Sequence, residues 1–317
     1  MKRLLNLVLA VVLFSLIGCV KILNDDLKTK ETKMVLNAAI SPDSLYTVNI
    51  SRTFNIFEDE SAHNLPFIDS AKVKLYEDGK FLSDLKNVGY GYYINPGFYP
   101  EIGKEYKIES SYGSLKSIES KTIIPPVVRV ADFDTVVLQY FDEYNGYEEQ
   151  YIGVLKYNDP ENVDNQYLLS CKVAITDVNG NVFWYDQGIW PIEGDDRFFD
   201  GSANGKLLWS DKYSNGNEVT VRFVFYSVYK YDEGRSRDTE KVHFVFSLQS
   251  VNFDYYTYLK SYDVYWESGG GEDPFAEPVV VHSNVENGYG IFGGYSQDTV
   301  STNIFFTYDG DGKGGDR

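Results

Sequence analysis

The sequence has few of the residues from which catalytic and metal sites are usually built. It contains two cysteines and three histidines in 317 residues, and no catalytic motif surrounds His63, His243 or His282. The patterns G-x-S-x-G and H-E-x-x-H and the phosphate-binding loop are also absent. The sequence therefore favours a protein that is not an enzyme.

Basic residues are scarce as well. The chain has 29 Lys and Arg against 47 Asp and Glu, which gives a formal net charge of −18. Such a chain repels phosphate backbones, so we expect no nucleic-acid partner, and its acidic surface favours solubility. Acid pairs such as Glu148-Glu149 and Asp195-Asp196 follow from this composition. They leave a carboxylate-dependent hydrolase as an alternative, because a glycosidase needs two carboxylates at a set separation.

One acidic stretch resembles the start of a calcium-binding loop, Asp177–Asn181. An EF-hand loop has about twelve positions and closes with a Glu. The residue at the twelfth position from Asp177 is Gly188. We therefore expect a turn here, and we expect the protein to have no metal site and no other cofactor.

The N-terminal segment has the composition of a secretory signal. Lys2 and Arg3 precede an apolar run from Leu4 to Leu16, which is too short to cross a bilayer, since a span takes about 20 apolar residues. We predict a signal peptide over residues 1–18. The next residues, Leu16-Ile17-Gly18-Cys19, resemble the lipobox of bacterial lipoproteins. This resemblance implies that Cys19 is acylated, and several acyl chains make such an anchor stable.

A polar tether and two β domains are expected after the anchor. Residues 19–32 suit a tether, and residues 33–125 alternate polar and apolar positions between closely spaced turns, which predicts a small β-sandwich. Asp78-Gly79 predicts a hairpin, and Pro125-Pro126 closes the domain. Residues 126–308 predict a larger antiparallel β domain, and residues 309–317 a flexible tail.

The second domain contains long alternating strands and one helical stripe. One strand face is predicted to carry Tyr167, Leu169, Cys171, Val173 and Ile175, and another Val242, Phe244, Phe246 and Leu248. If Cys19 is lipidated, Cys171 has no disulfide partner, and we expect it to be a buried hydrophobic residue. The spacing of Phe253, Tyr256, Leu259 and Tyr262 predicts a helix, with Asn252 as its N-cap.

The stretch from Asp273 to Ser296 is rich in glycine and carries His282. We predict a short strand over Val279 to His282 and a turn at Asn287-Gly288. The glycines at 290, 293 and 294 are expected to bend the chain tightly, so that Ile291 and Phe292 return to the core. Because His282 has no partner at ligand spacing, we predict a structural role for it.

Aromatic residues in glycine-rich stretches are the candidate ligand-binding positions. GYGYYINPGFYP contains Tyr92 and Tyr99, and FWYDQGIWPIEGDDRFF contains Trp184 and Trp190. Exposed aromatic rings stack on sugars or grip peptides, so the expected ligand is a glycan or a peptide. The alternative is that these rings fill strands and line the seam between the domains.

The order of these features resembles a known family. The lipobox, MVLNAAISPDSLYTVNISRTF, AKVKLYEDGK, GKEYKIES, NDPENVDNQYLLSCKV and the DPFAEP…GIFGGY block are similar to those of domain of unknown function 4249. Its members are Bacteroidetes lipoproteins often found beside TonB-dependent outer-membrane receptors. The resemblance implies a location in the outer membrane, on its periplasmic or its surface side, and an immunoglobulin- or transthyretin-like first domain. It carries over no catalytic residue.

Three functions follow from the sequence. The leading hypothesis is a lipid-anchored, non-enzymatic binding or accessory subunit of a TonB-dependent nutrient uptake system. The second is a structural or assembly protein of the envelope that binds protein partners. The third is the carboxylate-dependent hydrolase.

Overall fold

The computed structural model describes residues 31–54, 66–142, 146–176, 180–192, 194–195, 198–226, 240–269, 277 and 279–306. The predicted signal peptide, Cys19 and the 309–317 tail lie outside these ranges. The described chain is mostly β, and its one α-helix is α2 (Phe253–Glu267), with a 3-10 turn, η2, at Asp211–Tyr213. No helix in these ranges is both long enough and apolar enough to span a membrane. The prediction of a mostly β fold with one short helix is confirmed, and the immunoglobulin- or transthyretin-like character of its first part stays a prediction.

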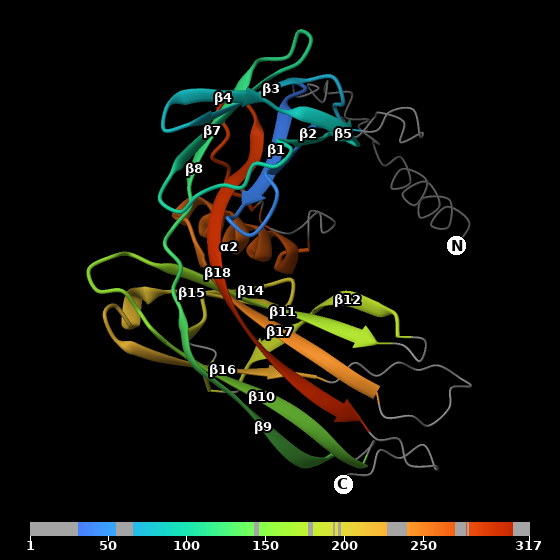
Figure 1. Cartoon of the computed structure of the whole chain (residues 1–317), viewed down its shortest axis with the longest axis vertical. Helices are drawn as coiled ribbons and strands as arrows, with labels where there is room; N and C mark the ends of the chain where they lie inside the picture. Colours follow the sequence, from blue (N-terminus) through green and yellow to red (C-terminus); the bar gives the residue numbers. More distant parts are fainter. Residues whose placement is uncertain are drawn as a thin grey trace, which may run out of the picture.

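A ten-stranded sheet runs along the molecule (Figure 1). Nine of its strands form a continuous path, and β12 pairs beside β11 off that path. In spatial order the strands are β14 (Gly201–Ala203), β15 (Lys206–Ser210), β11 (Gln166–Thr176), β17 (Glu240–Val251), β18 (Tyr289–Phe306), β1 (Met34–Ile40), β2 (Thr47–Arg52), β6 (Tyr92–Ile94) and β5 (Lys86–Gly89), with β12 at Val182–Gln187.

Strand β18 belongs to both halves of this sheet. Its first residues pair in parallel with β1, from Tyr289 opposite Val35 to Gly294 opposite Ile40. From Tyr295 onward it pairs antiparallel with β17. A strand of 18 residues is about 60 Å long at the usual rise per residue. The end of the described chain therefore joins the N-terminal strands to the C-terminal ones.

A four-stranded sheet packs on each half of the large sheet. The N-terminal one has the order β4 (Lys80–Asp84), β3 (Lys72–Glu77), β7 (Glu105–Ser111), β8 (Ile118–Ile123). The C-terminal one, called the C-terminal sheet below, has the order β13 (Ile189–Pro191), β16 (Glu218–Phe225), β10 (Gly146–Asn158), β9 (Val130–Asp142). Two β-sandwiches therefore share one continuous sheet, each with its own hydrophobic core.

The strand faces predicted from alternation form the C-terminal core. Successive side chains of a strand point to opposite faces, and all the predicted inward residues of β11 and β17 are buried in one cluster. Cys171 is among them, with 2% of its surface exposed. Burial raises the pKa of its thiol, which leaves it in the unreactive protonated form. The prediction of a buried, structural Cys171 is confirmed.

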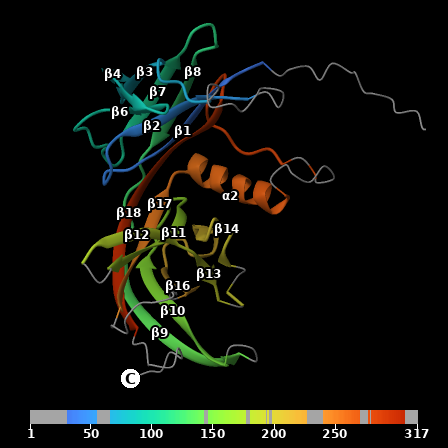
Figure 2. The same cartoon turned by 90° about the vertical axis from the view of Figure 1, so that its right-hand side faces the viewer.

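Helix α2 forms as predicted and packs on the outer face of the large sheet (Figure 2). Its N-cap is Asn252, whose side-chain oxygen accepts a hydrogen bond of 3.2 Å from the Tyr255 amide. The Tyr255 ring lies 6.4 Å from that of Tyr295 in β18. A Cβ at Gly293 would come within 2.6 Å of the Tyr255 ring, so this glycine lets the helix approach the strand.

The glycine-rich stretch before β18 differs from its prediction in two ways. Residues 279–285 form no strand; the His282 amide instead donates to Ser261 Oγ of α2 at 2.8 Å, and its ring nitrogen Nε2 lies 2.9 Å from Asp254 Oδ1. The segment lies along helix α2 because the backbone amide of His282 finds its hydrogen-bond acceptor there. The chain also does not bend at Gly293 and Gly294, which lie within the continuous strand β18. The turns at Asp78-Gly79 and Asn287-Gly288 are confirmed.

Candidate functional site

The four aromatic residues predicted to bind a ligand are all exposed, but they do not form one site. Tyr92 and Trp184 are 47% and 55% exposed, and Tyr99 and Trp190 are 55% and 42% exposed. Tyr92 lies in β6, and Tyr99 lies in the loop that follows β6. Both belong to the N-terminal half, whereas the two tryptophans belong to the C-terminal half. Cys19 lies outside the described residues.

Trp184 lies on the outer face of the large sheet. It is the edge member of a cross-strand row that continues through Ala174, His243 and Asn303. Its ring is 6.4 Å from that of His243, and His243 Nδ1 is 2.9 Å from Asn303 Oδ1. Ala174, within this row, is only 5% exposed. The neighbours of Trp184 on this face are therefore mostly polar.

Trp190 lies on the outer face of the C-terminal sheet and begins a different row. The register places Trp190 beside Val224, Val224 beside Ile152, and Ile152 beside Val136. This row takes one apolar residue from each of the four strands. The opposite faces of the same strands carry buried residues such as Phe223, so the row faces away from the core.

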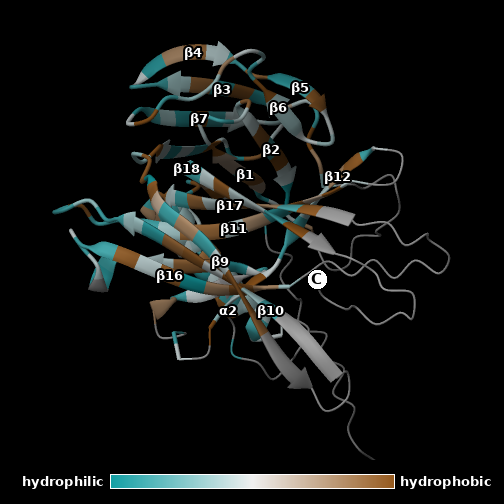
Figure 3. Cartoon of the chain, turned by 60° about the horizontal axis from the view of Figure 1, so that its bottom comes forward, coloured by the Kyte–Doolittle hydropathy of each residue, from teal (hydrophilic) through white to brown (hydrophobic). Residues whose placement is uncertain are grey.

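Two further side chains extend this row into a patch. The Tyr226 ring lies 5.3 Å from that of Trp190 at 60°, and Leu138 lies two residues beyond Val136 on the same face of β9. Tyr226 is 41% exposed, Val136 and Trp190 are 42% exposed, and Leu138 is 46% exposed. Between them, Ile152 is half-buried and Val224 is buried, at 5%. We call this patch the Trp190 surface, and it consists of Val136, Leu138, Ile152, Trp190, Val224 and Tyr226. Hydrophobic residues recur along β9, β10 and β16 in Figure 3. A contiguous exposed apolar patch marks an interaction site more often than single exposed side chains do.

A glycine fixes where the Trp190 ring lies. A Cβ at Gly188 would come within 2.7 Å of the ring carbon Cη2 of Trp190. The Trp190 ring therefore lies over the backbone of Gly188, and it also contacts the ring of Tyr226. The missing Cβ of Gly205 permits its close approach to this corner, because a Cβ there would meet the Gly188 Cα at 2.7 Å. This corner, where the chain passes from β12 to β13, presents the indole.

Ion pairs border the patch on one side. The rows next to it carry Arg222 and then Lys156. Arg222 donates from Nε and Nη2 to the two carboxylate oxygens of Asp195, at 2.8 and 2.9 Å. Lys156 Nζ lies 3.1 Å from Asp132. An apolar centre with a charged rim is the usual arrangement of a protein–protein interface.

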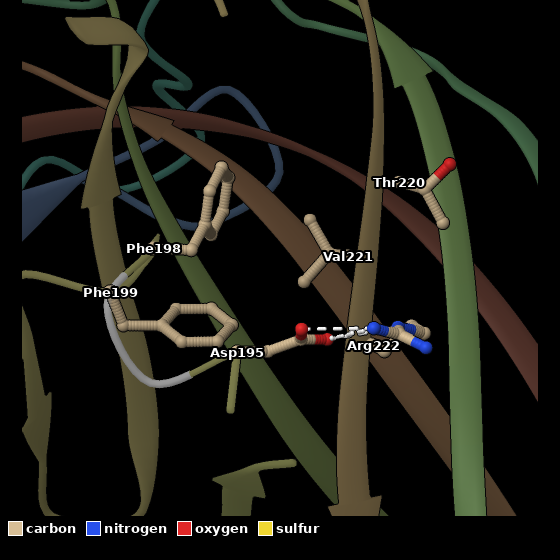
Figure 4. A pocket seen from close by; sticks show the side chains of 6 residues that line it. All are labelled: Asp195, Phe198, Phe199, Thr220, Val221 and Arg222. Carbon is tan, nitrogen blue, oxygen red and sulfur yellow. Dashed lines mark hydrogen bonds and ion pairs between the residues drawn. The ribbon is translucent and has the colours of Figure 1, made fainter. Parts of the chain in front are cut away.

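A cavity of about 450 Å³ lies beside Arg222 (Figure 4). Phe198 and Phe199 form its apolar wall, with their ring centroids 5.3 Å apart, and both rings pack against Trp209. The volume is in the range of small-molecule sites. The Arg222 guanidinium is already paired with Asp195, so the cavity offers no unpaired cation from this side chain to an anionic ligand. Its remaining lining residues are Thr220 and Val221.

Sequence reasoning found Trp190 but missed the residues that make it part of a surface. Val136, Val137 and Leu138 are consecutive apolar residues, which usually indicate a buried strand. Here all three are more than 40% exposed, because β9 is the edge strand of its sheet. The contribution of Ile152 and Val224 depends on strand pairing, for which the sequence has no local signal.

One family matches the chain. The family described as Domain of unknown function (DUF4249) matches residues 20–301. A search of curated proteins found no match.

Proposed function

Since the chain belongs to the family Domain of unknown function (DUF4249), we propose that it is an outer-membrane lipoprotein, anchored through Cys19. We propose further that it is a non-enzymatic binding or accessory subunit of a TonB-dependent nutrient uptake system. Its action is recognition: a rigid β scaffold presents a surface to the transporter or to the ligand that the transporter takes up, a glycan or a peptide.

The Trp190 surface is the observation that carries this proposal. It lies on the regular strands of a sheet whose other face is a packed core, so its side chains are held in place before a partner arrives. Pre-organisation of this kind lowers the cost of binding. Tryptophan and tyrosine are also the residues that most often dominate binding energy at interfaces. We therefore assign the contact with the receptor to this surface.

The extent of the surface favours a protein partner over a small molecule. Five of its residues come from four neighbouring strands, which span about 15 Å across at the usual strand spacing, and Tyr226 directly follows β16. Small ligands bind in concave sites that enclose most of their surface. The neighbouring cavity, lined by Phe198 and Phe199, suits an anchoring side chain of the same protein partner.

Co-purification tests the proposal. The lipidated protein is captured from detergent-solubilised membranes of its native host, grown with and without candidate nutrients, and the recovered proteins are identified by mass spectrometry. Recovery of a β-barrel receptor, together with loss of uptake when the gene is deleted, supports the accessory function. Recovery of other envelope proteins, independent of any nutrient, would support the assembly function instead. Failure to recover any barrel receptor would contradict the proposal.

A further inference from the structure

A second exposed aromatic surface lies at the opposite end of the molecule, where β1 and β18 begin. Its members come from four segments that are distant in the sequence, and each is at least 39% exposed. We call it the tether-end surface, and it consists of Phe54, Phe67, Val88, Tyr90, Tyr92 and Tyr289. Figure 1 shows this end, near β2 and β5, far from β9 and β10.

Strand register brings these segments together. Tyr289 pairs with Val35, Val35 pairs with Ser51, and Ser51 forms a bridge with Phe67. Side chains in one such row point to the same face of the sheet. Phe67 in turn meets Tyr90, with ring centroids 6.1 Å apart at 84°. This row and the ring contact therefore place β18, β1, β2 and the β5–β6 turn side by side on one face.

The β5–β6 turn holds Tyr90 in an unusual conformation. Its φ is +53°, between Gly89 at +99° and Gly91 at +73°. A non-glycine residue stays in this region only where its surroundings require it. Asp69 Oδ1 accepts hydrogen bonds from the Gly91 amide at 2.6 Å and from Asn87 Nδ2 at 3.2 Å, and these bonds lower the pKa of Asp69. These hydrogen bonds therefore stabilise the turn in a conformation that leaves Tyr90 69% exposed.

The chain enters the fold at this same end. Lys33 directly precedes β1, and its backbone amide donates to Thr53 Oγ1 at 3.0 Å. It follows Cys19 by fourteen residues, which span at most about 50 Å when fully extended. Phe67 lies two strands away from β1, or about 10 Å at the usual strand spacing. The tether therefore leaves the fold beside the tether-end surface.

Two cations lie over rings at this end. Lys33 Nζ is 4.8 Å from the centroid of Tyr289, and the Arg52 guanidinium carbon is 5.2 Å from that of Phe54. Tyrosine and phenylalanine with nearby Lys or Arg are typical of the membrane–water interface, where rings enter the headgroup region and long basic side chains reach the water.

We propose that the tether-end surface lies against the lipid interface of the membrane that carries the anchor. This proposal rests on the lipid anchor at Cys19 that is part of the proposed function, and it adds which face of the fold meets the lipid. The chain has 29 Lys and Arg against 47 Asp and Glu. A net negative charge of this size is repelled by anionic headgroups, so the preferred surface is zwitterionic.

This orientation separates the two surfaces. Strand β18 starts at the tether-end surface and runs about 60 Å along the molecule, and the C-terminal sheet packs over its second half, where Val300 and Ile304 meet the core. The Trp190 surface, on the sheet that packs over this second half of β18, is therefore held away from the bilayer, and a partner reaches it while the protein stays on the membrane.

An environment-sensitive label tests the orientation. The lipidated protein carries single cysteines for labelling, Tyr90→Cys or Phe54→Cys, with Tyr99→Cys as the matched control. Tyr99 is also exposed, at 55%, but it lies at the other end of β2. The carbonyl of Phe98, directly before it, accepts a hydrogen bond from the Tyr46 amide at that end. The native Cys171 does not compete for the label, because it is buried. Each protein is mixed with phosphatidylcholine vesicles, and flotation measures how much protein binds to them. The emission wavelength of the label reports the polarity of the label's surroundings.

The proposal predicts that the labels at positions 90 and 54 shift to the blue and gain several-fold in intensity on vesicles, while the label at 99 does not change. Anionic vesicles should give smaller changes at low salt. Flotation without a change at positions 90 and 54 would overturn the orientation and leave the anchor intact. Failure of the protein to float would contradict the anchor itself, and with it this orientation.

Discussion

Trp184 and Trp190 point away from opposite faces of the C-terminal sandwich, although they lie close together in the sequence. Trp184 belongs to the row that contains His243 in the large sheet, and Trp190 to the row that contains Val224 in the C-terminal sheet. The chain changes sheets between them, at Gly188. One ligand therefore does not contact both indoles on the same face, and each tryptophan serves as a control for the other.

Gly188→Ala is predicted to weaken partner binding without unfolding the protein. The added methyl group would come within 2.7 Å of the Trp190 ring, and the exposed ring can move away from it at little cost. We expect a several-fold loss of affinity for the recovered partner and an unchanged midpoint in urea. In a double-mutant cycle, Gly188→Ala should have no further effect once Trp190 is replaced by Ala. An equal loss of affinity in the wild type and in Trp190→Ala would show that Gly188 does not act through the Trp190 ring.

Tyr157→Phe is predicted to destabilise the C-terminal sandwich. The Trp209 indole donates a hydrogen bond of 2.8 Å to the Tyr157 hydroxyl, and both residues are completely buried. The variant would leave the indole N–H unpaired in the core, which costs about 1–3 kcal/mol. Urea unfolding measures this loss. Tyr185→Phe, at a side chain that is 45% exposed, should change stability by less than about 0.5 kcal/mol.

The docking of α2 is predicted to weaken in acid through Asp200. Its carboxylate accepts hydrogen bonds from Tyr256 Oη at 2.6 Å and from Ser210 Oγ at 3.1 Å, and Lys260 Nζ lies 3.4 Å away. Burial alone would raise the pKa of Asp200, but these bonds and the Lys260 charge outweigh it and lower the pKa. Because the folded pKa is the lower one, the stabilisation is fully present above the ordinary carboxyl pKa of about 4 and is lost as the pH falls below it.

Asp200→Asn measures this contribution. The difference in urea stability between the wild type and the variant should be constant from about pH 7 to pH 5 and should shrink as the pH falls below about 4. Asp43→Asn, at an exposed position before β2, is the control and should show a much smaller difference. A difference that stays constant down to pH 3 would contradict the assignment of the acid-sensitive contact to Asp200.

Cys19→Ser is predicted to release the protein from the membrane fraction. In the proposed anchor this thiol carries the first acyl chain, and without acyl chains the anchor would be lost. Fractionation of cells by centrifugation, followed by immunoblotting, measures the change. Cys171→Ser is the matched control and should leave the protein in the membrane, because this residue is buried in the core. Retention of Cys19→Ser in the membrane would show that the lipobox interpretation is wrong.

Local patterns in the sequence predicted the local structure well. Alternation identified the inward faces of β11 and β17, because a pleated strand presents every second residue to the core. The spacing of Phe253, Tyr256 and Leu259 identified α2, and Asn252 marked its start. These features depend only on neighbouring residues, so they are visible without any knowledge of the fold.

Pairings between distant segments could not be predicted in the same way. The parallel register of β18 with β1 joins residues near the two ends of the chain, and no local pattern specifies it. The sequence therefore predicts bends at the glycines of β18, whereas these glycines allow the close approach of Tyr255 and of the Ile123 carbonyl. The Trp190 surface also depends on such pairings, which is why only Trp190 was found.

Paired alanine variants test whether the Trp190 surface binds the partner. Wild-type protein, Trp190→Ala and Trp184→Ala are immobilised in equal amounts, and the affinity for the receptor recovered from membranes is measured. Loss of a central tryptophan contact typically costs about 2 kcal/mol or more, which is about 30-fold in affinity. We predict this loss for Trp190→Ala and less than about a threefold change for Trp184→Ala. Equal affinity for the wild type and Trp190→Ala would contradict the claim.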